Sequence, residues 1–392
     1  MTPYEMLTQH ILPFWTSRMP DPQGGFYGRI DGRGVLHADA PKGAILNARI
    51  LWTFSSAHRV LGDPAYLEMA TRAKRALLDN FFDPDFGGIY WSLNSDGKPL
   101  DTKKQIYAIG FAIYGLSEYA RAIGDEETMA HAIKLFFDIE NHSFDTERNG
   151  YFEAFTREWG EIADMRLSDK DANEHKTMNT HLHILESYTN LYRVWPDARL
   201  GAAIRNLISI FTDRILDPQT FHLRLFFDDD WNSKVDKTSY GHDIETSWLM
   251  DKCLSVLGEE EYTDLIAPIT KTMAEQILSI AYKNHSLLNE CERGTDNTTR
   301  VWWVQAESVV GFLNAFQKTG AETYLETAAD IWAFIKEHLI DKRNGSEWFW
   351  CTDENGNPEP KKPIVEPWKC PYHNGRMCFE VMERAGKMKD EN

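Results

Sequence analysis

The chain has 392 residues, and its 42 lysines and arginines against 60 aspartates and glutamates give a formal net charge of −18. With 42% hydrophobic and 26% charged residues it has the composition of a globular protein with a large core, which excludes disordered and collagen-like chains. It has no apolar run long enough for a membrane span, no leader-like first segment and no basic stripe, so we expect a cytoplasmic protein without membrane or nucleic-acid partners.

A turn signal recurs along the chain at a nearly constant spacing. Asp21, Asp83 and Asp145 each come shortly before a glycine and an aromatic residue, and they are separated by 62 residues (83 − 21 = 62; 145 − 83 = 62). Asp217 and Asp341 continue the series, 124 residues apart (341 − 217 = 124, or twice 62). Glycines followed by an acidic residue recur with the same period, as expected where one helix ends and the next begins. The sequence therefore predicts an internal repeat.

Between the turn signals, apolar residues recur at the 3.6-residue spacing of amphipathic helices. Six helix pairs predict an all-α fold, an (α/α)6 barrel with an inner and an outer ring of helices and short β-hairpin-like segments in the loops. An open α-solenoid is the alternative. No linker divides the chain, so residues 1–392 are expected to form a single catalytic domain. The twelve predicted helices are at residues 2–18, 42–62, 64–81, 101–123, 125–141, 175–194, 197–215, 239–258, 259–282, 298–319, 321–338 and 371–387.

The second helix of each pair begins with polar and aromatic residues that a purely structural helix does not need. If these are the inner helices, their starts meet at one end of the barrel, and segments 160–174 and 284–297 form the walls of a cleft there. Convergent polar groups in an aromatic-lined cavity predict an active site. The candidate residues are Asn47, Arg49, Tyr107, Asn179, His183, His242, Glu245, Trp302, Trp303, Glu307, Trp368, His373 and Arg376.

A metal site is one alternative, because His183 and Glu186, like His242 and Glu245, have H-x-x-E spacing on one helical face. A transition metal normally needs three or four ligands, and no tight cluster completes such a set. The sequence also lacks the glycine-rich patterns that bind dinucleotides or nucleoside triphosphates. We therefore expect neither a metal nor a cofactor.

Thirteen tryptophans suit a carbohydrate ligand, because indole faces stack on sugar rings while Arg, Asn and Glu bond the hydroxyls. Histidines titrate near neutrality and can remove and return a proton next to a sugar aldehyde, which gives epimerisation or aldose–ketose isomerisation. A glycoside hydrolase would instead need two carboxylates, for which Asp243, Glu245 and Glu307 are the candidates. A carbohydrate-binding protein without catalysis is the remaining alternative.

Five motifs resemble those of the cellobiose 2-epimerases in the N-acylglucosamine 2-epimerase superfamily, and the similarity runs over essentially the whole chain. They are "LNARILW", "KTMNTHLHILESY", "SYGHDIETSWL", "TRVWWVQAE" and "WKCPYHNGRMC". The resemblance implies an (α/α)6 barrel and a cofactor-independent isomerase that interconverts glucose and mannose at the reducing end of β-1,4-linked disaccharides such as cellobiose, lactose or mannobiose. A monosaccharide enzyme acting on mannose or N-acetylglucosamine stays open, and we expect a monomer or a weak homo-oligomer.

The resemblance also implies the catalytic roles. His242 and His373 would lie on opposite faces of the reacting carbon and move the C2 proton through a cis-enediolate. His183 would assist ring opening or position C1 and O1, Arg49 would stabilise oxyanion charge on O1 or O2, and Glu245 would orient or tune His242. For substrate binding, the residues implied are Asn179, Trp303, Trp368, Trp302, Tyr107 and Glu307.

Overall fold

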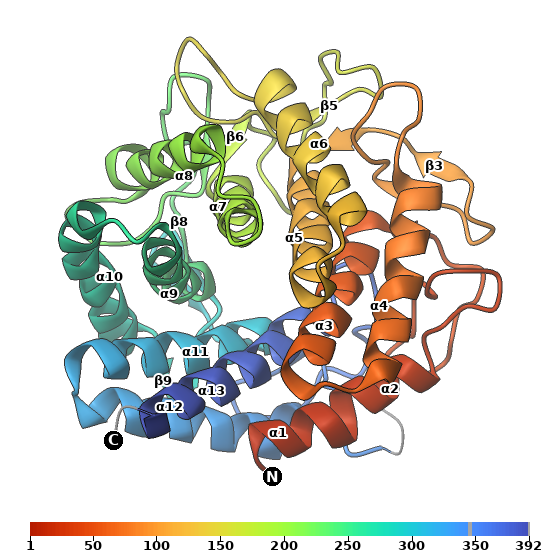
Figure 1. The fold of residues 1–392 in the computed structure, drawn as a ribbon. Coiled ribbons are helices and arrows are strands. Elements are labelled where there is room, and N and C mark those ends of the chain that lie inside the picture. Colours follow the sequence, from red (N-terminus) through yellow and green to blue (C-terminus); the bar gives the residue numbers. More distant parts are fainter. Residues whose placement is uncertain (344–346, 391–392) are drawn as a thin grey trace.

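In a computed structural model, which describes residues 1–343 and 347–390, the chain forms the expected (α/α)6 barrel (Figure 1). Six inner helices surround the barrel axis, and an outer helix precedes each of them in the chain. The inner helices are α3 (Ala44–Leu61), α5 (Ile106–Ile123), α7 (Met178–Tyr192), α9 (Tyr240–Leu257), α11 (Trp302–Thr319) and α13 (Tyr372–Asp390).

The outer ring has the predicted helices, several of which contain a π-helical turn. The first spans residues 3–17 as α1 (Pro3–Met6), the π-turn Leu7–Ile11 and α2 (Leu12–Ser17). The others are α4 (Pro64–Ala76, continued by Leu77–Phe81), α6 (Glu126–His142), α8 (Ala198–Ile210, continued by Phe211–Ile215), α10 (Glu260–Ile280) and α12 (Glu322–Phe334, continued by Ile335–Leu339).

The repeated glycines end four inner helices, as the sequence predicts. Gly62, Gly124, Gly258 and Gly320 adopt left-handed conformations, with φ between 68° and 74°, directly after α3, α5, α9 and α11. This conformation suits glycine because it has no Cβ to clash with the preceding turn. In two repeats the next residue, Asp63 or Asp125, then caps the following outer helix; Asp125, for example, accepts a hydrogen bond from the Thr128 amide.

The inner and outer helices differ in how much of their surface is buried. Every residue of α5 from Ile106 to Ala120 is buried, whereas α6 buries one stripe, at Thr128, Ala132, Leu135, Phe136 and Ile139. An all-round apolar helix belongs inside, and a stripe at three- and four-residue spacing belongs on the outside of the barrel. In the described residues no helix is long and apolar enough to cross a membrane.

Short antiparallel strands connect successive repeats. A strand directly before each of five inner helices pairs with a strand of a later loop, and Ile30 pairs with Val365 to join the first and last repeats. Three predicted helices therefore begin later than expected, at 106, 178 and 302 instead of 101, 175 and 298, because those residues are in or near strands. The pairs are β1–β2 (Lys42–Gly43, Ser92–Leu93), β4–β5 (Lys104–Gln105, Ala154–Phe155), β6–β7 (Lys176–Thr177, Phe226–Phe227), β8–β11 (Lys237–Ser239, Glu290–Glu292) and β13–β14 (Arg300–Val301, Cys351–Thr352). The remaining strands are β3 (Pro99–Asp101, paired with β2), β9–β10 (Tyr282–Lys283, Ser286–Leu287) and β12 (Thr295–Asn297, paired with β11).

A buried cation just before an inner helix fastens the hairpin that follows the preceding outer helix. Lys104 is an example: its Nζ atom lies 2.8 Å from Oδ2 of Asp83, and both side chains are fully buried. We call these residues the anchor cations. They and their hairpin partners are Lys42 with Asp21, Lys104 with Asp83, Lys176 with Asp145, Arg300 with Ser286, and Lys369 with Glu347.

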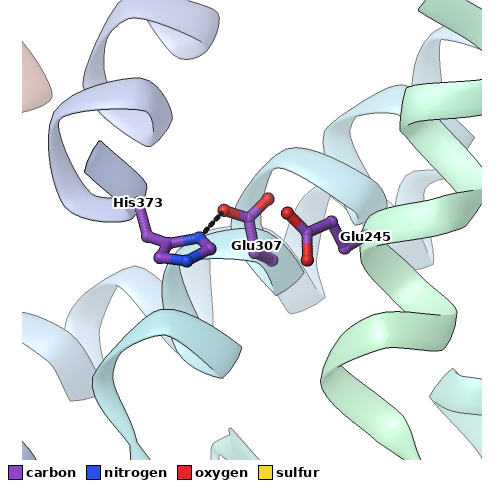
Figure 2. Close-up of side chains that lie close together, drawn as sticks. All are labelled: Glu245, Glu307 and His373. Atoms are coloured by element: carbon purple, nitrogen blue, oxygen red, sulfur yellow. Dashed lines mark hydrogen bonds and ion pairs between the residues drawn. The ribbon is translucent and has the colours of Figure 1, made fainter. Parts of the chain in front are cut away.

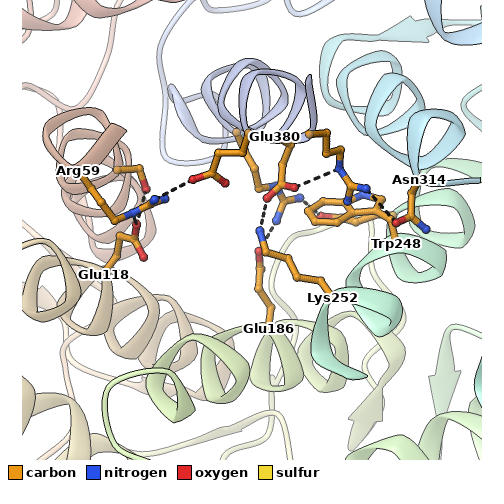
Figure 3. Close-up of polar contacts among 12 residues, drawn as sticks. Arg59, Glu118, Glu186, Trp248, Lys252, Asn314 and Glu380 are labelled. Carbon is orange, nitrogen blue, oxygen red and sulfur yellow. Dashed lines mark hydrogen bonds and ion pairs between the residues drawn. The ribbon is translucent and has the colours of Figure 1, made fainter. Parts of the chain in front are cut away.

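At the other end of the barrel, ion pairs tie α13 to other inner helices (Figure 3). Arg59 of α3 donates to Glu118 of α5 and to Glu383 of α13, with both N–O distances 2.7 Å. Lys252 of α9, which is two positions from α13 in the ring, pairs with Glu380 of α13. The last inner helix is thereby bonded to the adjacent α3 and, across the barrel, to α9.

Candidate active site

A cavity of about 1150 Å³ opens at the N-terminal ends of the inner helices. Of the predicted cleft walls, 160–174 and 284–297, the cavity is lined by residues 165–172 and 174 and by parts of 289–297. Of the predicted site residues, Arg49, Tyr107, Asn179, His183, His242, Glu245, Trp302, Trp303, Trp368 and His373 line the cavity. Glu307 does not line it and contacts His373 instead.

His373, at the start of α13, has one ring nitrogen fixed by a carboxylate. Its Nδ1 atom lies 2.7 Å from Oε1 of Glu307, which projects from α11 (Figure 2). The His373 side chain is 7% exposed, and its ring centroid lies 5.5 Å from that of Trp303. Because Nδ1 is engaged, Nε2 is the nitrogen left for a ligand.

His183 is held in the same way from within its own helix. Its Nδ1 atom lies 2.8 Å from Oε2 of Glu186, one turn later on α7. The other oxygen of Glu186 accepts a hydrogen bond from the Tyr372 hydroxyl at 2.5 Å. The H-x-x-E spacing noted in the sequence is thus a histidine–carboxylate contact in α7.

His242 has a different partner. Its Nδ1 atom lies 2.6 Å from the Ser239 hydroxyl, at the residue preceding α9, and its ring centroid is 4.8 Å from that of Trp303. Glu245, expected to orient His242, instead pairs with Arg376, and its Oε2 atom is buried without a hydrogen-bond partner among the described residues. The structure therefore puts a neutral hydroxyl, rather than a carboxylate, behind this histidine.

Arg376 joins the carboxylates beneath the histidines. It is fully buried and forms ion pairs with Glu186, Glu245 and Glu307, the last at 2.7 Å. Ligand atoms of Glu245, Glu307 and His373 lie within 4.8 Å of one another, which is a spacing compatible with a metal ion. The guanidinium already bonds both of these carboxylates, so it supplies the positive charge that an ion would bring.

Burial shifts the protonation equilibria of the site. Desolvation, followed by electrostatic interactions with His183 and Lys237, lowers the pKa of His242 to about 3. Desolvation and the charges of Arg49 and Arg376 also hold the pKa of His373 well below its usual range. Both imidazoles are therefore neutral at neutral pH, which leaves each with a basic nitrogen.

The carboxylates behind them differ from one another. Burial raises the pKa values of Glu245 and Glu307 to about 7. Burial also opposes ionisation of Glu186, but the charge of Arg376 and the hydrogen bond from His183 outweigh it and lower the pKa of Glu186 to about 2. The three carboxyl groups around Arg376 therefore differ in pKa.

Arg49 is a buried cation whose described contacts are neutral. Its Nη2 atom donates to the Tyr107 hydroxyl at 2.8 Å, and the guanidinium carbon lies 4.1 Å from the centroid of the Phe111 ring. The Nε atom has no partner among the described residues. A buried guanidinium at a cavity without a contacting carboxylate suits a ligand oxygen that carries negative charge.

Aromatic side chains form two groups that contribute to the cavity wall. Trp368 lies against Tyr107 and Trp91, with ring centroids 5.8 and 6.1 Å apart. Trp302 lies 4.6 Å from Trp350, which also lines the cavity and was not predicted. The Trp302 Nε1 atom and the Oδ1 atom of Asn179 are buried without hydrogen-bond partners in the described chain, so each is open to a polar ligand.

The sequence reasoning also missed Ser239 and Tyr372 as partners of the site. Both lie inside or beside motifs that were singled out, "SYGHDIETSWL" and "WKCPYHNGRMC". A serine three residues before a helical histidine is a local signal for the contact that Ser239 makes. Tyr372 gave no signal, because its partner Glu186 is 186 residues away in the chain.

Fold and cavity together define a sugar-processing enzyme of the (α/α)6 type, and residues 25–374 match the N-acylglucosamine 2-epimerase (GlcNAc 2-epimerase) family. The chain belongs to this family and is a carbohydrate epimerase, an isomerase. It is 56% identical to the cellobiose 2-epimerase of Bacteroides fragilis over 96% of both chains, and 44% identical to that of Ruminococcus albus over 97% of both. The structure of cellobiose 2-epimerase from Bacillus thermoamylovorans superimposes with a TM-score of 0.93 at 44% identity, covering 97% of this chain and 98% of that one.

Proposed function

We propose that the protein is a cofactor-independent disaccharide 2-epimerase, which converts the reducing-end glucose of cellobiose, and of lactose or mannobiose, to mannose and back. The similarity to cellobiose 2-epimerases over nearly the full chain supports this substrate class. The observation that carries the chemistry is that His242 and His373 flank Trp303 in one cavity, each with Nδ1 engaged and Nε2 available.

In the proposed reaction, one histidine removes the C2 proton of the open-chain sugar as a general base. The electrons form a cis-enediolate, and rotation about the C2–C3 bond presents the other face. The second histidine then gives a proton to C2. The pair must hold one proton between them at the start, so substrate binding has to favour one imidazolium although the protein environment alone favours two neutral rings.

The different partners of the two histidines suggest how that proton is placed. A carboxylate on Nδ1 stabilises an imidazolium, whereas a hydroxyl does so only weakly. His373, bonded to Glu307, is therefore the better candidate for the protonated member, and His242, bonded to Ser239, for the base in that direction. In the reverse reaction the two exchange roles.

The roles that we propose for the remaining catalytic residues rest on their contacts. Arg49 would bind the oxyanion that develops on O1 or O2, where a preorganised donor is most effective. His183 would assist ring opening, since its Nδ1 atom is also held by a carboxylate. We assign Glu307 to positioning His373, in place of the substrate contact expected from the sequence.

Substrate binding is assigned to side chains that line the cavity. The tryptophans Trp303 and Trp368 would stack on the two sugar rings, with Trp302 and Tyr107 beside them. Asn179 would bond a hydroxyl through its Oδ1 atom, which has no partner among the described residues. The Oε2 atom of Glu245 also lacks a partner in that part of the chain; with a pKa of about 7, this side chain would accept a hydrogen bond from a sugar hydroxyl, or a proton.

Incubation in D2O with cellobiose, glucose, mannose and N-acetylglucosamine, each alone, tests the proposal. Deuterium at C2 of a mannose-configured disaccharide is the expected result. Exchange confined to a monosaccharide favours a monosaccharide epimerase, and a ketose product favours an aldose–ketose isomerase, because the same enediolate can be protonated at C1. Release of glucose from cellobiose without exchange would contradict the proposal in favour of a hydrolase.

A further inference from the structure

The helix that carries His242 lacks an anchor cation. Five of the six inner helices have a lysine or arginine two or three residues before them that bonds the preceding hairpin: Lys42, Lys104, Lys176, Arg300 and Lys369. Before α9 the equivalent position is Thr238. The adjacent Lys237 pairs with Glu290 of the cleft wall, 3.0 Å away, instead of bonding the hairpin that follows α8.

A histidine–aspartate pair takes the place of the anchor cation in this repeat. Asp243, next to His242 in the first turn of α9, is fully buried, and its Oδ2 atom lies 2.7 Å from Nδ1 of His222. Its Oδ1 atom accepts a hydrogen bond from the Leu223 amide at 3.0 Å. His222 and Leu223 belong to the hairpin that follows α8, in which Leu216 pairs with Leu223. The carboxylate is thus on the helix and its partner in the hairpin, the reverse of the four repeats in which a lysine before the helix pairs with a hairpin carboxylate.

The same hairpin also reaches the helix that carries His183. The Met178 amide, at the start of α7, donates to the Leu225 carbonyl at 2.9 Å. The His222–Asp243 contact therefore lies on a short path between the starts of α9 and α7. Through this path it connects the backbone of His242 with that of His183.

We propose that His222 and Asp243 are positioning residues that hold the first turn of α9 against the hairpin and so set the place of His242 in the cavity. This inference rests on the proposed function only for its kinetic test. Two of its features favour a role at the site: the helix that carries His242 is the one without an anchor cation, and Asp243 is the direct neighbour of His242. A misplacement of about 1 Å can cost 10²-fold in rate, so a loosened α9 start would be seen in turnover.

His222→Ala and His222→Asn are the two test variants. An asparagine amide lies near the place of Nδ1 and can donate to Asp243, whereas alanine cannot. We expect His222→Ala to lower kcat for cellobiose epimerisation by about tenfold or more, with KM within about twofold because the tryptophans on α11 stay in place. His222→Asn should recover at least half of the wild-type kcat.

The matched control is His285→Ala. His285 is also in a hairpin, outside the residues that line the cavity, and bonds an aspartate, Asp330, at 2.7 Å through Nδ1, but Asp330 is on the outer helix α12 and not on an inner helix. This variant should keep the wild-type kcat and KM. Wild-type turnover in His222→Ala, or a loss that His222→Asn does not restore although circular dichroism shows it folded, would overturn the inference.

Two further measurements guard against ambiguous outcomes. If His222→Ala does not fold, Asp243→Asn, which keeps the side-chain shape and the acceptor for Leu223, should still lower kcat at unchanged KM; wild-type kcat in this variant rejects the pair. The second is the imidazole 15N signal of His242, identified by its loss in His242→Ala. It should shift in His222→Ala and stay in place in His285→Ala. Because it needs no turnover, it separates failure of this inference from failure of the proposed function.

Discussion

Glu307 and His373 face each other across two helices, with Oε1 of the glutamate 2.7 Å from Nδ1 of the histidine. The contact decides which nitrogen of His373 is presented to the cavity and favours its protonated form. Glu307 also accepts hydrogen bonds from Arg376 and, at 3.1 Å, from Trp248. The carboxylate is therefore held on three sides and can hold the imidazole in turn.

Glu307→Gln should lower kcat by about 10²-fold, because a neutral amide no longer stabilises the imidazolium and turns an N–H toward either Arg376 or His373. KM should change little, since Glu307 does not line the cavity. Steady-state kinetics with cellobiose check both values. Glu326→Gln, an exposed change on α12, is the control, and a Glu307→Gln enzyme as fast as this control would contradict the positioning role.

His242→Ala and His373→Ala should each abolish epimerisation while the protein stays folded. Both side chains border the cavity without forming its core, so the loss follows from missing proton transfer and not from unfolding. Proton exchange at C2, followed by NMR in D2O, measures each half of the reaction. Substantial epimerisation by either variant would refute the assignment of that histidine.

Arg49→Lys should cost about 10²-fold in kcat/KM. Lysine keeps the charge, but it lacks the planar fork that bonds Tyr107 and lies over the Phe111 ring. Kinetics and a thermal melt on the same preparation separate lost catalysis from lost stability. Arg199→Lys, at a largely exposed position on α8, is the control for replacing an arginine with a lysine. Equal kcat/KM values for the two variants would exclude Arg49 from the oxyanion site.

The stability of the protein should depend on pH through Glu153. Burial raises the pKa of this carboxyl group to about 8, although it accepts hydrogen bonds from Thr177 and Thr180 at the start of α7. Between the unfolded value near 4.5 and about 8 the folded protein binds more protons than the unfolded chain, so the stability falls as pH rises through this range.

Glu153→Gln removes that titration. The melting temperature of the variant relative to wild type should therefore rise from pH 5 to pH 8. Differential scanning calorimetry across this range measures the difference, and a constant offset would show that Glu153 is already ionised in the folded protein at pH 5.

Treatment with a chelator should leave the activity unchanged. Arg376 already bonds Glu245 and Glu307, the carboxylates of the cluster that most resembles a metal site. The comparison is between enzyme dialysed against EDTA and enzyme dialysed against buffer. A loss of activity that one added divalent ion restores would show that the cluster holds a metal.

The parts of the molecule that follow from local sequence were predictable. Glycine caps such as Gly62 and Gly124, and the one-sided apolar pattern of α6, give the helices and their order. The starts of α5, α7 and α11 could not be predicted from local sequence. Strands such as Lys104–Gln105 form only by pairing with residues about 50 positions away in the chain. Helical periodicity contains no information about such a partner.

The same distinction applies to the candidate site. Residues that project from the inner-helix starts, such as His183 and Trp368, were identified because the repeat places all of those starts at one end. The contacts behind them depend on the relative rotation of neighbouring helices. The bond from Glu307 to His373, and the choice of Ser239 over Glu245 for His242, arise from that rotation, which single-chain patterns do not specify.

The pairing of Ile30 with Val365 also bears on how the molecule is made. The Ile30 amide donates to the Val365 carbonyl at 3.0 Å, across 335 positions of the chain (365 − 30 = 335). During synthesis, the helices with Arg49, Tyr107 and His183 emerge long before the segment that closes the ring. Until then the growing chain is an open arc with an uncovered apolar edge, and the entropy of closing it is lost in one late step. Helix content therefore accumulates early, whereas the sugar cavity, with His373 on the last inner helix, forms only at the end.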